Sequence, residues 1–306
     1  MNQNLTGILP VLPTPFTPDG AVDEAAMLRV VDFALACQPS GLVWPGFASE
    51  VDDLTPEERG RLLRAIVSHV NGRVPIVAGA SSPDVADVIA RCKEAQSLGI
   101  HYAMIQAPKS VGVNVEAVTA FYAAIAAGAP GIAIILQNAP APRGSDLSPE
   151  LVLAVARANP AIRYIKEETL PSGPAISALV AGKPAHVAGV IGGGGARYLL
   201  EELRRGACGA MPAAELTDVH VAMFTAYQAG DMARARMLYA RTLPLLVMQA
   251  FSRMRFTKYV LTKRGVLTNN EVRAKIPPLD AHEQAEIDAW LEASADLLTT
   301  APVLGA

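Results

Sequence analysis

The sequence predicts an α/β protein with the (β/α)8 TIM-barrel fold, followed by a C-terminal helical extension. Eight short apolar runs alternate with amphipathic segments along most of the 306 residues, which is typical of βα units that build a parallel sheet. No glycine-rich dinucleotide fingerprint follows the first run, so a closed barrel is favoured over a doubly wound sheet. Beyond residue 215 the sequence shows only helical patterns.

Each predicted strand is apolar on both faces, as expected for a strand with helices outside and a packed barrel inside. The predicted strands are residues 7–12, 41–44, 75–79, 102–106, 132–137, 163–166, 187–191 and 208–211. The predicted helices between them are residues 23–36, 56–70, 83–98, 115–127, 149–158, 174–180 and 198–205. Three of these helices open with a capping hydroxyl before a first-turn proline and an acid, at Thr55, Ser82 and Ser148.

We expect two parts, a catalytic barrel over residues 1–215 and the helical extension over residues 216–306. The extension is predicted as helices at 218–229, at 232–263 with an interruption near Pro244, and at 281–299. It is unusually apolar between Met237 and Phe251. These side chains fit either an intramolecular core or a subunit interface.

Composition excludes several classes of protein. With 26 Lys+Arg against 29 Asp+Glu, a net charge of -3 and no basic stripe, we expect no nucleic-acid partner. The mean hydropathy is +0.27, but breakers interrupt every long apolar window, so we expect no membrane span. Without a signal-peptide pattern, a cytoplasmic location follows. Three cysteines without CxxC spacing and five scattered histidines predict no disulfide framework and no metal.

In a barrel the active site lies at the carboxyl ends of the strands, and one predicted strand ends in a lysine, at Arg163-Tyr164-Ile165-Lys166-Glu167-Glu168. Because side chains alternate along a strand, Glu168 shares the face of Lys166 while Glu167 points away. A lysine in a barrel interior is suited to attack a ketone and form a Schiff base. The alternative is a structural ion pair between Lys166 and Glu167 or Glu168.

Three other strand ends offer candidate substrate-binding groups. The small-residue loop that contains Gly46, Phe47 and Ala48 has backbone N–H groups suited to a carboxylate, although a plain turn is the alternative. Gln137 and Asn138 place amides at the end of the fifth strand. The glycine run that begins with Gly192 and Gly193 allows backbone to approach an anion, but it lacks the lysine of a nucleotide-binding loop.

Jointly, these motifs resemble the dihydrodipicolinate synthase/N-acetylneuraminate lyase family. The resemblance covers essentially the whole chain and rests on Thr14-Pro15-Phe16, Gly46-x-x-x-Glu50 with Leu54-Thr55, Asn138-x-Pro140, Ile165-Lys166-Glu167 and the stretch from Arg273 to Leu279. It implies a barrel with a helical tail, usually tetrameric. It also implies a cofactor-free class I mechanism in which Lys166 forms an imine with the C2 ketone of a 2-oxo acid.

The chain departs from the family pattern at functional positions. Where the family has Gly-Thr-Thr-Gly-Glu, Phe47 and Ala48 remove the hydroxyl of its proton relay. Gln137 stands in place of the tyrosine that serves carbon–carbon cleavage, and an amide is no general base near neutral pH. The arginine that the synthases use for a second carboxylate falls at Pro142 or Arg143, which puts dihydrodipicolinate synthesis in doubt.

These departures disfavour carbon–carbon cleavage and leave elimination of water as the expected reaction. Glu168 stands where family members usually have a small residue, and it is placed to act as acid and base beside the imine. The pattern resembles the 2-keto-3-deoxy-L-arabonate dehydratases of the family, whose product is 2,5-dioxopentanoate on an oxidative pentose route. Two alternatives remain, a pyruvate-dependent aldolase and a non-catalytic sensor of a 2-oxo acid.

Overall fold

Eight strands and eleven α-helices occur between residues 4 and 298, the part of the chain that the computed structural model describes. The strands are β1 (Gly7–Ile8), β2 (Leu42–Val43), β3 (Ile76–Gly79), β4 (Tyr102–Ile105), β5 (Ala133–Asn138), β6 (Ile162–Glu167), β7 (Gly189–Gly192) and β8 (Gly209–Ala210). The helices are α1 (Glu24–Ala36), α2 (Pro56–Val70), α3 (Val85–Ser97), α4 (Val115–Gly128), α5 (Pro149–Ala158), α6 (Ser172–Gly182), α7 (Leu199–Arg204), α8 (Thr217–Gln228), α9 (Met232–Gln249), α10 (Arg253–Lys263) and α11 (Ala281–Ala293). Each predicted strand position contains an observed strand, so the predicted alternation is confirmed.

The chain divides into two compact units. Of the described residues, the first consists of 4–6, Pro75–Gly194 and Glu201–Ala210. Its strands β3 to β8 lie in chain order, and each pairs with the next in parallel. The carboxyl ends of parallel strands meet at one edge, so residues that end β5, β6 and β7 are brought together.

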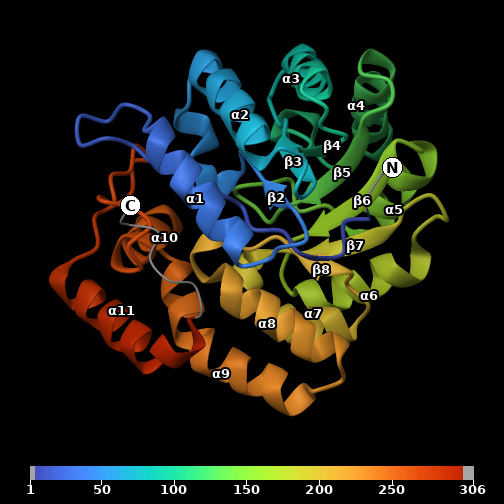
Figure 1. The fold of residues 1–306 in the computed structure, drawn as a ribbon. Helices are drawn as coiled ribbons and strands as arrows, with labels where there is room; N and C mark the ends of the chain where they lie inside the picture. The colour runs from blue at the N-terminus through green and yellow to red at the C-terminus, as the bar shows by residue number, and fades with distance from the viewer. Residues whose placement is uncertain (1–3, 299–306) are drawn as a thin grey trace. The chain divides into compact units, whose positions relative to one another are not determined.

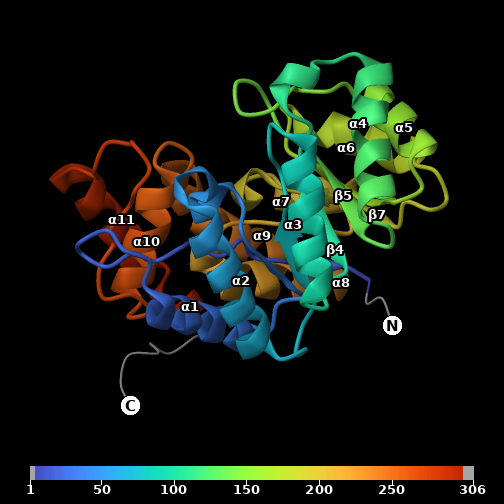
Figure 2. The same ribbon diagram turned by 90° about the horizontal axis from the view of Figure 1, so that it is seen from above.

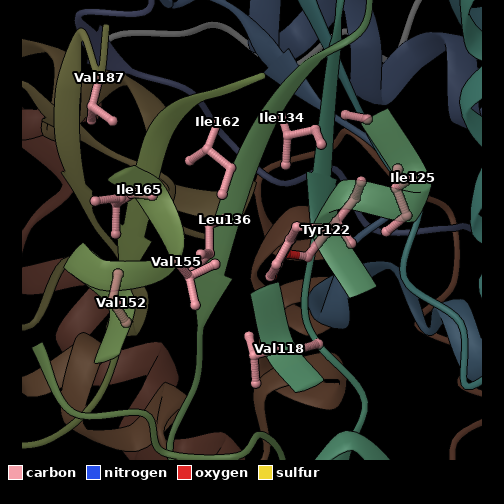
Figure 3. Packing of buried hydrophobic residues seen from close by; sticks show 14 of the residues in the cluster. Val118, Tyr122, Ile125, Ile134, Leu136, Val152, Val155, Ile162, Ile165 and Val187 are labelled. Carbon is pink, nitrogen blue, oxygen red and sulfur yellow. The ribbon is translucent and has the colours of Figure 1, made fainter. Parts of the chain in front are cut away.

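The core of the first unit lies between its strands and the helices α3 to α6. Figure 2 shows α4, α5 and α6 gathered beside β5 and β7. In Figure 3, Val118 and Tyr122 of α4 point toward Ile134 and Leu136 of β5, and all four are buried. The buried aliphatic side chains therefore fix the outer faces of β5 and β6, whose carboxyl ends carry the candidate lysine.

The second unit consists of Gly7–Val74, Gly195–Leu200 and the described residues 211–298. Backbone bonds pair the first two strand regions, with Val43 N–H donating to the Pro10 carbonyl at 3.0 Å. In Figure 1, α8 and α9 lie side by side and α11 packs on α9. The core of these C-terminal helices includes Leu245, Phe256 and Ile287.

The helical extension differs in two details from its prediction. Pro244 lies inside α9, and the break comes later, between Gln249 and Arg253. The helix predicted at 281–299 ends at Ala293, and its last predicted residue lies outside the described residues. Part of the apolar stretch belongs to the core, because Leu245 and Leu246 are buried, whereas Val247 and Phe251 are exposed and the subunit interface stays a prediction. The predicted boundary at residues 215/216 stays a prediction.

The capping residues are confirmed at two of three helix starts. Thr55 and Ser148 accept hydrogen bonds from the backbone of the first turn of α2 and α5. At α3 the cap is Asp84, and the helix begins at Val85. Ser82 lies before this cap, where its hydroxyl donates to the Asp87 carboxylate at 3.1 Å and accepts from Asp84 N–H at 3.3 Å.

Candidate active site

Lys166 lies next to the carboxyl end of β6 and is buried. In the parallel register it is the partner of Gln137 on β5 and of Ile191 on β7. Partners in register project their side chains to the same face of a sheet. Lys166 and Gln137 therefore leave neighbouring strands side by side, and only 4% of the lysine remains exposed.

Glu168 follows β6 and lies against Lys166. Its Oε1 atom is 2.8 Å from Lys166 Nζ and accepts a hydrogen bond from Gln137 Nε2, also at 2.8 Å. Its Oε2 atom accepts a hydrogen bond from Arg143 Nη2 at 2.7 Å. The predicted position of Glu168 beside Lys166 is thus confirmed, and the ion pair that the sequence offered as an alternative is present too.

The charges around Glu168 keep it ionised. Burial alone would raise the pKa of Glu168, but the charges of Lys166 and Arg143 outweigh burial and hold the pKa well below its usual range. The resting site is therefore a lysine, a carboxylate and an arginine in one contact chain. Sequence reasoning did not assign Arg143 to this group, because the arginine comes from a loop and no periodic pattern fixes the direction of its side chain.

Glu167 and Asn138 lie together on the opposite side of the two strands. Asn138 Nδ2 donates to Glu167 Oε2 at 2.9 Å and to the Leu147 carbonyl at 2.8 Å. Asn138 Oδ1 accepts from Leu147 N–H at 3.0 Å. These bonds close the loop that carries Arg143. Asn138 thereby anchors the loop, and its predicted contact with substrate stays a prediction.

Gly192 and Gly193 end β7, next to β6. A Cβ atom at Gly193 would overlap Glu168 Cγ and lie 2.8 Å from its Cδ. A Cβ atom at Gly192 would overlap Glu202 Oε2 and lie 2.8 Å from Glu202 Cδ. The two glycines therefore leave room for two carboxylate side chains. Their predicted role as backbone that approaches an anion is not tested by these contacts.

Gly46, Phe47 and Ala48 belong to the second unit, where they enter a short 3-10 turn. Ser49 Oγ accepts a hydrogen bond from Gly46 N–H at 2.9 Å, and Thr14 Oγ1 donates to the Ser49 carbonyl at 2.7 Å. Ala48 is buried, whereas Phe47 is 40% exposed. The loop is a fixed turn, and its predicted binding of a carboxylate stays a prediction.

A buried ion pair follows this turn. Lys258 Nζ lies 2.6 Å from Glu50 Oε1 and 4.1 Å from the centre of the Phe16 ring. Burial lowers the pKa of Lys258 to about 8, although the Glu50 charge opposes the shift. Glu50 Oε2 accepts backbone hydrogen bonds from Arg273 and Ala274, both at 2.8 Å. These contacts hold the C-terminal part of the second unit against its N-terminal loops.

Among residues 4–298, no cluster of three or more His, Cys, Asp or Glu side chains is placed to hold a metal ion. None of the helices described there has the length and apolar character needed to cross a membrane.

Residues 4–294 match the Dihydrodipicolinate synthetase family. The chain is 31% identical over 285 residues to L-2-keto-3-deoxyarabonate dehydratase of Azospirillum brasilense, with 92% of each chain covered. It is 37% identical over 165 residues to 4-hydroxy-tetrahydrodipicolinate synthase of Xylella fastidiosa, where the match spans only 54% of either protein. The chain thus matches about half the length of this second relative.

Solved structures show the same fold. A dihydrodipicolinate synthase from Rhodopseudomonas palustris has a TM-score of 0.86 at 23% identity, with 94% of this chain and 97% of that chain covered. A prophage protein of the dihydrodipicolinic acid synthase family from E. coli K12, in complex with pyruvate, has a TM-score of 0.87 at 24% identity, with 97% and 100% covered. The predicted (β/α)8 TIM barrel with a C-terminal helical extension is therefore confirmed.

Proposed function

The chain belongs to the dihydrodipicolinate synthetase family, a family of lyases, and we propose that it is a Schiff-base dehydratase of a 2-keto-3-deoxy sugar acid. The observation that carries this proposal is the contact of Glu168 with Lys166, held from its other sides by Gln137 and Arg143. The likeness to an L-2-keto-3-deoxyarabonate dehydratase over 92% of both chains supports 2-keto-3-deoxy-L-arabonate as the substrate.

Imine formation is the first step of the proposed reaction. The neutral Lys166 amine attacks the C2 ketone, and loss of water gives the iminium. Glu168 then removes a proton from C3, and the electron pair of that C–H bond neutralises the nitrogen as an enamine. The carboxyl group of Glu168 loses one of its two cationic neighbours at this point, while Arg143 remains, and this loss favours retention of the proton it has just taken.

Elimination follows from the enamine. The C3 electron pair forms a double bond to C4 and expels the C4 hydroxyl, which leaves as water with the proton of Glu168. Loss of a C5 proton and tautomerisation of the resulting enol give the C5 aldehyde, and water hydrolyses the imine to restore Lys166. The balance is loss of one water, from 2-keto-3-deoxy-L-arabonate to 2,5-dioxopentanoate.

Gln137 favours this outcome over carbon–carbon cleavage. A retro-aldol step needs a base for the C4 hydroxyl, and a carboxamide is not basic near neutral pH. Here the Gln137 amide donates to Glu168 instead, so this position orients the acid/base group. The further prediction that the backbone of Phe47 and Ala48 binds the substrate carboxylate rests on the sequence alone.

The test is to incubate the protein with 2-keto-3-deoxy-L-arabonate and identify the products. We expect 2,5-dioxopentanoate. Pyruvate with glycolaldehyde would contradict the proposal and identify the protein as an aldolase. Borohydride reduction with pyruvate should add one adduct at Lys166, found by peptide mass mapping. Lys166→Met should abolish the adduct and Lys183→Met should retain it, because Lys183 lies elsewhere and donates to the Val187 carbonyl.

The non-catalytic sensor makes a different prediction, because it requires binding of a 2-oxo acid without turnover. Binding of 2-keto-3-deoxy-L-arabonate with no loss of water would support it against the dehydratase.

We also propose a homotetramer, for which exposed Val247 and Phe251 on and after α9 are candidate contact residues. Sedimentation equilibrium measures this mass directly, and a monomer at all concentrations would contradict it.

A further inference from the structure

Glu202 is a third buried acid at the same strand ends, and the proposed reaction does not use it. It lies on α7 within the first unit and is 1% exposed. Its Oε1 atom accepts a hydrogen bond from Ser172 Oγ at 2.7 Å. Its Oε2 atom is buried and has no hydrogen-bond partner among the described residues. A buried polar atom without a hydrogen-bond partner is costly in free energy.

The glycine corner of β7 connects Glu202 with the candidate active site. Glu202 Oε2 lies against Gly192, and the side chain of Glu168 lies against Gly193. A Cβ atom at either glycine would overlap the carboxylic side chain beside it. Two acidic side chains therefore flank consecutive glycines at one strand end, one at each glycine.

The groups that act on Glu202 are three carboxylates and one hydroxyl. Burial raises the pKa of Glu202 to about 7, the Ser172 hydrogen bond opposes this rise, and the charges of Glu168, Glu201 and Glu167 add to it. Glu201 lies on the same helix, and its Oε1 atom is 2.8 Å from Arg205 Nη2. Glu202 thus faces carboxylates on β6 and a hydroxyl on α6, and its protonation changes the charge beside Glu168.

We propose that Glu202 is a positioning residue that acts on Glu168 across the Gly192–Gly193 corner, and that loss of its proton makes Glu168 a stronger base. This inference rests on the proposed function, because it concerns the group that removes the C3 proton. Lys166 and Arg143 hold the resting Glu168 as a weakly basic carboxylate. A second negative charge nearby offsets part of that effect by electrostatic repulsion.

Exchange of the pyruvate methyl protons in heavy water tests this inference without requiring dehydration. Pyruvate has a C3 position but no C4 hydroxyl, so imine formation and proton removal occur without elimination, and proton NMR follows the loss of the methyl signal. The comparison is between the wild type, Glu202→Gln and the matched control Glu201→Gln. Glutamine keeps the Ser172 hydrogen bond and is neutral at every pH.

We expect equal exchange rates in the wild type and Glu202→Gln at about pH 6, and a wild-type rate about fivefold higher at about pH 8. Glu201→Gln removes a charge that adds to the raised pKa of Glu202, so this control should keep the full rise in rate and move it to slightly lower pH. In Ser172→Ala the ionised form of Glu202 loses its hydrogen bond, so the rise in rate should move to higher pH. This second variant retains the Glu202 carboxyl and applies even where Glu202→Gln does not fold.

Two other outcomes would contradict either the inference or the proposed function. The inference is wrong if the methyl exchange rate of Glu202→Gln, or of Ser172→Ala in its place, depends on pH as the wild-type rate does. If Lys166 forms its adduct in the same experiment, the proposed function stands. If the wild type neither forms an adduct at Lys166 nor exchanges the methyl protons, the Schiff-base proposal is wrong and the inference falls with it.

Discussion

Replacement of Glu168 by Gln separates the nucleophile from the acid/base group. In the resting site the carboxylate lies 2.8 Å from Lys166 Nζ and stabilises the ammonium form. Glutamine keeps the size of the side chain and removes its charge. A hydrogen bond to a charged group contributes about 1.5 to 3 kcal/mol, and 1.4 kcal/mol is a factor of ten. The fraction of neutral amine at Lys166 should therefore rise by about tenfold or more at neutral pH.

The assay is the initial rate of adduct formation with pyruvate and borohydride, measured by intact mass at about pH 7. Glu168→Gln should form the adduct about tenfold faster than the wild type, since the amine is the nucleophile. Methyl exchange in heavy water should fall sharply in the same variant, because the base is lost. Slower adduct formation in a folded Glu168→Gln protein would refute this reasoning and show that Glu168 carries a proton during imine formation itself.

Three further predictions follow from buried side chains. Folded Glu202 keeps its proton up to about pH 7, against a usual pKa of 4.5. Between pH 4.5 and about pH 7 the wild type should lose about 3 kcal/mol of unfolding free energy relative to Glu202→Gln. Urea unfolding at several pH values measures this, and the same change of unfolding free energy with pH in both proteins would contradict it. Gly193→Ala should displace Glu168 and abolish methyl exchange while the Lys166 adduct still forms. A methyl exchange rate equal to that of the wild type would show that Gly193 does not fix the position of Glu168. Lys258→Met leaves Glu50 buried without its cation and should cost about 3 to 5 kcal/mol in urea unfolding, with part of the loss restored by adding Glu50→Gln.

Local periodicity was enough to place the strands and most of the helices. β5 is buried on both faces, and β6 is buried except at Arg163. Alternation also placed Glu168 beside Lys166, because two residues along a strand return to one face. Pro244 predicts a break in the helix, but it lies inside α9, because a helix interior that is stabilised by tertiary packing tolerates the loss of one backbone donor.

The charged contacts across the strand ends could not be predicted from local sequence patterns. Arg143 reaches Glu168 from a loop that Asn138 fixes through Leu147, and Glu202 reaches the glycine corner from a helix over thirty residues after Glu168. The direction of each side chain depends on where distant backbone segments meet, which spacing does not encode. The sequence by itself determined the barrel, the lysine and its neighbouring glutamate. The tertiary structure alone decided which cation and which second acid surround that glutamate, because electrostatic coupling depends on distance through space and on burial.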